Sequence, residues 1–146
     1  MGITTGKAAE PLTTADYAEL AAFRRSLREF LRFSEDAAAE AGITSRHYQA
    51  MLFLRACQAE RRVTINDLAQ ELLIKHNSAV GLVDRLVRER MVGRKPSRGD
   101  RREVELRLTA RGRNLLARLA AIHRAELVRI GPALRRFFGG VARLRG

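Results

Sequence analysis

The stretch from residue 63 to residue 112 constrains the fold most strongly, because it holds two short helical patterns followed by two strand-like runs. Thr64 and Asp67 have capping-box spacing at the start of the first helix, which keeps helical apolar spacing as far as Leu72. After a short break, a second helix carries apolar residues at Ala79, Leu82, Val83 and Leu86. Two short amphipathic helices joined by a tight turn predict a helix-turn-helix, whose second helix fits a DNA major groove.

The run after the second helix predicts a β-hairpin. Residues 103–108 alternate charged and apolar side chains, as a half-buried strand does. Pro96 and Gly99 bracket a turn just before this run, so basic side chains would project from a hairpin tip. A hairpin that follows a helix-turn-helix is a wing. The predicted fold class is therefore mainly α with a small β-hairpin wing, extended by terminal dimerisation helices.

The order and spacing of these motifs resemble the winged-helix signature of MarR-type transcriptional regulators. The matching motifs are Asp67-Leu68-Ala69, Leu82-Val83-Asp84-Arg85-Leu86, Val92-Gly93-Arg94, Asp100-Arg101-Arg102, Val104, Leu106, Leu108-Thr109 and Gly112. Length and helix order extend the resemblance to the whole chain. It implies a sequence-specific regulator of transcription that binds double-stranded DNA, and it favours a repressor that a small-molecule ligand releases.

The charge of the chain is strongly basic and is concentrated around the predicted wing. The formal net charge is +12, and between Arg85 and Arg113 eleven Lys and Arg residues outnumber four Asp and Glu residues. A polyanionic partner explains this best, because contacts with backbone phosphates supply most non-specific affinity through counterion release. A solvated arginine-rich surface from a GC-rich genome is one alternative. A basic structural protein that binds nucleic acid without sequence specificity is the alternative function class.

The chain has the size and composition of one domain with helical extensions. Its 146 residues and 46% hydrophobic content are enough to bury a core. The expected units are a flexible N-terminal tail (1–12), dimerisation and support helices (13–62), the winged helix-turn-helix (63–112) and C-terminal dimerisation helices (113–146). A single cysteine, and the lack of a signal pattern or a long apolar run, lead us to expect a soluble cytoplasmic protein.

Capping signals set the expected bounds of the helices that precede the winged unit. Thr13 and Asp16 have capping-box spacing at the start of a long helix, which Gly42 ends. A hydroxyl residue at 44–45 caps the next helix, over residues 46–59. The apolar side chains of that helix lie nearly all round it, which predicts burial on several sides.

The C-terminal segment should form two helices that take part in a homodimer. Thr109 begins a long helix, Gly131-Pro132 interrupts it, and Pro132 suits the first position of a final helix. The adjacent Phe137 and Phe138 require a cover, which a second copy of the terminal helices would supply. The alternative is that these helices fold back on their own core. The resemblance favours a dimer, whose two-fold symmetry implies a near-palindromic operator.

Exposed side chains near the start of the second helix of the helix-turn-helix are the candidates for major-groove recognition. Asn77 can form paired hydrogen bonds to adenine, and Val80 can contact a thymine methyl group. Ser78 or Lys75 can bind phosphate. Alternatively, Asn77 or Ser78 serves only as a helix cap. The full candidate set is Lys75, His76, Asn77, Ser78, Val80 and Arg85.

Gly81 departs from the MarR-type pattern. Many MarR-type proteins carry a hydroxyl residue and then an arginine where this chain has Val80 and Gly81. Gly81 offers no side chain to a base. Its presence would permit a closer backbone approach or shift base recognition to His76 and Arg85.

The predicted wing tip carries the second group of candidate DNA contacts. The resemblance implies that Arg102 enters the minor groove while Asp100 orients it. Arginine in that groove senses the negative potential of narrow A·T tracts. Arg98 and Arg101 would contact phosphates or insert in its place. The alternative is that Asp100 and Arg102 pair only to hold the turn.

The resemblance also implies an effector site between the dimer helices and the winged unit, for a small aromatic or anionic compound. Candidate lining residues are Phe30, Arg46, His47, Tyr48 and Met51, although these residue types suit a core or helix surface equally well. Cys57 lies on an apolar helix, which favours an inert core cysteine over a redox sensor.

Enzyme chemistry is not expected. His47, His76 and His123 are scattered, and the sequence has no metal-ligand spacing and no Gly-rich phosphate loop. We therefore expect no catalytic residues, no metal and no cofactor.

Overall fold

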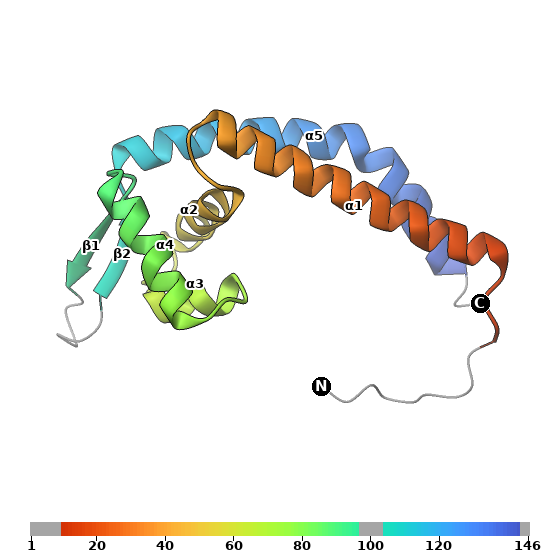
Figure 1. The fold of residues 1–146 in the computed structure, drawn as a ribbon, viewed down its shortest axis with the longest axis horizontal. Helices are drawn as coiled ribbons and strands as arrows, with labels where there is room; N and C mark the ends of the chain where they lie inside the picture. Colours follow the sequence, from red (N-terminus) through yellow and green to blue (C-terminus); the bar gives the residue numbers. More distant parts are fainter. Residues whose placement is uncertain (1–9, 97–103, 144–146) are drawn as a thin grey trace.

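The computed structural model describes residues 10–96 and 104–143. In chain order the elements are α1 (Thr14–Glu40), α2 (Ser45–Cys57), α3 (Ile65–Glu71), α4 (His76–Arg88), β1 (Val92–Pro96), β2 (Val104–Leu108) and α5 (Ala110–Arg143). Figure 1 shows two parts: a lobe that holds α2, α3, α4 and the hairpin, and an arm in which α1 and α5 run side by side. The predicted fold class is confirmed. Within the described residues, no helix is long and apolar enough to cross a membrane.

Capping boxes begin the first three helices, and the sequence predicts two of these boxes and the hydroxyl cap of the third. Thr13 caps α1 with Asp16, and Thr64 caps α3 with Asp67. Thr44 is the cap of α2, and its partner is His47 rather than an acidic residue. In each box a threonine oxygen accepts a backbone N–H that the helix leaves unpaired, and the partner side chain accepts the cap's own N–H.

The core of the lobe forms where α2, α3, α4 and the hairpin meet. The apolar face predicted for α4 is buried, and Val83 and Leu86 are almost fully inaccessible. The N–H of Leu106 in β2 donates to the carbonyl of Val63 at 2.9 Å, which fastens the hairpin to the α2–α3 connector. The prediction that α2 is buried on several sides was wrong in part, because Leu52 is 43% exposed.

A close backbone contact explains the Thr-x-x-Gly spacing after β2. Thr109 Oγ1 donates to the carbonyl of Arg90 at 2.6 Å and accepts the N–H of Gly112 at 3.0 Å. A Cβ atom at Gly112 would lie 2.1 Å from the carbonyl oxygen of Met91. Only glycine fits there, so this residue lets the start of α5 pack against the chain that leaves α4.

The predicted break at Gly131-Pro132 was wrong, since α5 continues through Pro132 to Arg143 as one helix. Proline disfavours the helical conformation in the residue before it, partly through a clash with that residue's Cβ. Gly131 has no Cβ, so this part of the clash is absent. The hydrogen bond that Pro132 cannot donate, and the crowding of its ring against the carbonyl four residues earlier, are the costs that remain.

The arm joins the lobe through a buried polar network around His123. Its Nε2 lies 2.8 Å from Ser34 Oγ of α1, and its Nδ1 lies 2.7 Å from the carbonyl of Leu119. The Tyr48 ring of α2 stacks on the imidazole with centroids 4.1 Å apart. Because a carbonyl can only accept, Nδ1 donates to it. Three helices therefore meet at one side chain.

Candidate nucleic-acid interface

The start of α4 presents polar side chains to solvent. Lys75 is the N-cap residue, and its side chain makes no capping hydrogen bond. Asn77 and Ser78 lie inside the helix and are exposed. The alternative that one of these two residues caps α4 was wrong. Their side chains are therefore available to a ligand at the helix N-terminus, where the helix dipole also favours an anion.

His76 is held by a residue that the sequence analysis did not identify. Its Nδ1 lies 2.7 Å from Oδ1 of Asn66 on α3. Because an amide oxygen only accepts, Nδ1 carries the proton, and Nε2 is the atom left for an outside partner. The signal for Asn66 in the sequence is weak, since an exposed asparagine early in a helix is common. Its role depends on the angle at which α3 meets α4.

The candidates on α4 do not all lie on one face. Helical spacing places His76 and Val80 toward α3, whereas Ser78 and Arg85 lie on the opposite flank. Arg85 Nε pairs with Glu89 Oε1 at 3.3 Å and its side chain lies beside His47 of α2. The structure therefore brings His76 and Val80 together and sets Arg85 apart from them.

Gly81 lies on the exposed face of α4, and no atom lies within 4 Å of the position that a Cβ would take. The glycine is therefore not required for packing. A larger side chain would fit at this position in the protein alone.

An ion pair joins the wing to α4. Arg94 of β1 pairs with Asp84 of α4, a residue that the sequence analysis named only as part of a matching motif. β1 and β2 are antiparallel, with Val92 opposite Leu108 and Pro96 opposite Val104. The hairpin thus confirms the predicted wing. The tip candidates Arg98, Asp100, Arg101 and Arg102 lie outside the described residues.

Asp67, which caps α3, also anchors the connector that precedes it. Its carboxylate accepts the N–H of Thr64 at 2.9 Å and lies 3.3 Å from Arg61. Burial acts to raise the pKa of Asp67, but the hydrogen bonds from Thr64 and the charge of Arg61 outweigh it and lower that pKa. The carboxylate therefore stays charged at neutral pH and keeps the start of α3 in place.

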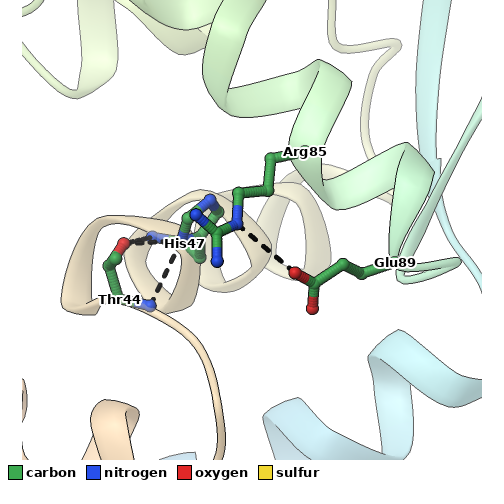
Figure 2. Close-up of polar contacts among 4 residues, drawn as sticks. All are labelled: Thr44, His47, Arg85 and Glu89. Carbon is green, nitrogen blue, oxygen red and sulfur yellow. Dashed lines mark hydrogen bonds and ion pairs between the residues drawn. The ribbon is translucent and has the colours of Figure 1, made fainter.

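The predicted effector residues point to several different places. Met51 is fully buried in the core, Tyr48 stacks on His123, and Phe30 meets the edge of the same imidazole. Arg46 is exposed, and His47 faces α4 (Figure 2). The structure brings Phe30 and Tyr48 together at His123 and does not gather the other three with them. Cys57 ends α2 and is half-buried against the core.

A helix-turn-helix followed by a two-stranded wing places this chain in the winged helix-turn-helix class. Residues 41–103 match the model of the MarR family. Among curated proteins, no sequence matches the chain.

Solved structures share the fold. The DNA complex of S. aureus MepR is 18% identical, with 93% of this chain and 96% of that chain covered and a TM-score of 0.67. AbsC, a MarR family transcriptional regulator from Streptomyces coelicolor, is 20% identical over 91% and 84% of the two chains, with a TM-score of 0.66. RV1404 from Mycobacterium tuberculosis is 25% identical over 84% and 82%, with a TM-score of 0.65.

The family match and the shared fold agree with the sequence motifs. Residues 41–103 therefore form a winged helix-turn-helix unit of the MarR family, a family of DNA-binding transcription regulators rather than enzymes, and the whole chain shares the fold of solved MarR-type proteins.

Proposed function

We propose that the protein is a homodimeric repressor that binds a near-palindromic operator in double-stranded DNA and is released by a small-molecule effector. The observation that carries the proposal is the start of α4, where Lys75, Asn77 and Ser78 are exposed beside a hairpin wing. Recognition helices of this fold place such residues in the major groove, and a wing contacts the adjacent backbone or minor groove.

The arm supports the dimer. Large apolar side chains on both of its helices are exposed in a single chain: Tyr17 61%, Leu20 45%, Leu31 54%, Leu127 46%, Val128 72% and Phe138 56%. Apolar surface of this extent is typical of a protein interface. A second copy packed on the arm would cover these side chains and would set the spacing between the two α4 helices.

Within this proposal, the side chains near the start of α4 divide into two roles. Asn77 and Val80 would contact bases, His76 would present Nε2 to a base or a phosphate, and Lys75 and Ser78 would bind phosphates. At the wing, Arg102 would enter the minor groove with Asp100 beside it, while Arg98 and Arg101 would contact phosphates. Arg85 would contribute charge from the flank of α4.

The effector part of the proposal has two candidate places. One is the junction at His123, where Phe30 and Tyr48 provide aromatic surface. The other is a cavity of about 360 Å³ between the end of α1, the start of β1 and α5. Its lining residues are Ala41, Met91, Arg111, Asn114, Leu115 and Arg118. Met91 and Leu115 supply apolar surface, while the asparagine and the two arginines supply hydrogen-bond donors. This lining would suit an aromatic anion.

The test is selection of random duplexes by the purified protein, followed by sequencing and a salt titration on the enriched duplex. An inverted repeat, with half-sites about one helical turn apart, is the expected result. Asn77→Ala should relax base preference at one position of each half-site. Arg102→Ala should weaken binding strongly. Arg25→Ala, which removes the same charge from α1, is the matched control and should change little.

A basic structural protein without sequence specificity remains the alternative. It would give no enriched motif, similar affinity for every duplex or RNA, and a binding constant that depends on salt through phosphate contacts alone. In that case Arg102→Ala and Arg25→Ala would have similar small effects.

A further inference from the structure

His47 closes the cap of α2 with a ring that must be neutral (Figure 2). The backbone N–H of Thr44 donates to His47 Nδ1 at 3.2 Å, and Thr44 Oγ1 lies 2.5 Å from the same nitrogen. A backbone N–H can only donate, so Nδ1 holds its lone pair and the proton sits on Nε2. A proton added to Nδ1 would face the N–H of Thr44 and break this half of the capping box.

The same ring lies against the recognition helix. His47 is 6% exposed and lines a narrow crevice with Arg85, Leu86 and Glu89 of α4, and with Ile43 of the preceding loop. The charged groups that act on it, Arg85 and Glu89, both belong to α4, and they pair with each other at 3.3 Å. The N-terminal end of α2, with its partial positive charge, lies directly under the ring.

Burial, Arg85 and the N-terminal end of α2 all disfavour a positive charge on the His47 ring, and only Glu89 favours it. Burial has the largest effect and lowers the pKa of His47 below its usual value of 6.5. The positive charge of Arg85 lowers that pKa further, and only the carboxylate of Glu89 raises it. The α2 cap is thus unlike those of α1 and α3, whose aspartates keep their charge at mildly acid pH.

We propose that His47 is a pH-sensitive pivot on which α4 rests: the neutral ring holds α4 against α2, and proton uptake by the ring moves α4 away. The charged ring would lose its bond from the Thr44 backbone N–H, keeping only Oγ1 of that residue as an acceptor, and would repel both Arg85 and the positive end of α2. Movement of α4 away from α2 relieves the repulsion from Arg85. The consequence for DNA rests on the proposed function, because displaced recognition helices would no longer match successive grooves of an operator.

The sign of the effect follows from the lowered pKa. A neutral His47 contributes stability that is complete above pH 6.5, the unfolded value, and is lost as the pH falls through the lower folded-state pKa. Acid should therefore weaken both the fold and operator binding through His47.

Nitrogen NMR of the histidine rings in the full chain, without DNA, tests the pivot directly. The expected spectrum shows His47 as the Nε2–H tautomer at neutral pH, titrating below pH 6.5 together with a shift of the Arg85 Nε signal. An Nδ1–H tautomer of His47 would overturn the proposal, and so would an Arg85 Nε chemical shift that stays constant while His47 titrates.

Binding to the selected duplex at about pH 7.5 and about pH 5.5 tests the consequence. We expect affinity to fall in acid, by up to about tenfold for each unit by which DNA binding lowers the pKa of His47. Glutamine also closes a capping box but does not titrate, so His47→Gln should abolish the loss. The matched control, Gln49→Ala at an exposed position of the same helix, should retain it.

Two results separate this proposal from the proposed function. If His47→Gln and the unmodified chain lose affinity equally in acid, the pivot is refuted and operator binding stands. If no duplex is bound at either pH, operator binding is refuted, while NMR and the difference in unfolding free energy between the two pH values still decide on the pivot.

Discussion

The lobe and the arm differ in what covers their apolar side chains. In the lobe, Leu68, Val83 and Val92 are no more than 2% exposed, and the chain itself provides every neighbour. In the arm, Tyr17 and Val128 remain 61% and 72% exposed although α1 and α5 already lie side by side. The core of the lobe is therefore complete within one chain, whereas the arm keeps a row of exposed apolar side chains that the proposed second copy would cover. Substitutions in the two parts should accordingly differ in whether they change folding or assembly.

Gly112→Ala should have the largest effect and should act on folding. The added Cβ would lie 2.1 Å from the carbonyl oxygen of Met91, a backbone atom that cannot move away by a side-chain rotation. Forced overpacking of this kind costs about 3 kcal/mol. Urea unfolding should show this loss, and the wing should be disturbed with it. The control is Gly81→Ala in α4, where the Cβ has open space and should stabilise the helix by up to about 1 kcal/mol. Equal effects of the two substitutions would contradict the account.

Val128→Asp should act on assembly and leave the lobe folded. A carboxylate placed twice in an apolar, symmetric interface costs a few kcal/mol, so the dimer should dissociate about a hundredfold more readily. Sedimentation equilibrium measures this change. Leu73→Asp, at a side chain of the lobe that is 92% exposed, is the matched control and should leave the dimer intact. A monomeric parent protein would contradict the proposed dimer, and an unchanged dimer would show that another surface is used.

Leu73→Gly should have the smallest effect, and its sign is favourable. Leu73 has a φ of 53° in the turn between α3 and α4, a conformation that costs a leucine about 1 to 2 kcal/mol. Glycine adopts it without strain but loses more chain entropy, so a net gain of about 0.5 to 1 kcal/mol is expected from urea unfolding. Destabilisation would mean that the Leu73 side chain makes a contact which its exposure does not indicate.

Local signals in the sequence predicted much of the fold. Two capping boxes, the hydroxyl cap of α2, the apolar face of α4 and the alternation of β2 each depend on residues close in sequence, and all of them appear in the structure. The break at Gly131-Pro132 was wrong because the prediction counted the glycine as a further helix breaker and did not consider that it has no Cβ to clash with the proline ring. Gly131, one position before Pro132, lowers the steric cost of placing a proline inside this helix.

The candidate site was predicted in part. Exposure of the start of α4 follows from helical spacing, so Asn77 and Ser78 are found where the pattern places them. The partners of the site residues were not foreseen. Asn66 lies ten residues from His76, and Arg94 lies ten residues from Asp84, and each pairing depends on the angle between two elements. His47, first considered as an effector contact, faces α4 for the same reason.

The central claim is that the lobe recognises DNA while the arm fixes the distance between two lobes. Binding to the selected inverted repeat, compared with the same repeat lengthened by about five base pairs at its centre, tests it most directly. The insertion turns one half-site to the opposite face of the duplex. The account predicts two protomers on the original repeat and a loss of affinity of about a hundredfold or more on the lengthened one. Equal affinity for both duplexes would contradict it, because each lobe would then bind without reference to a second.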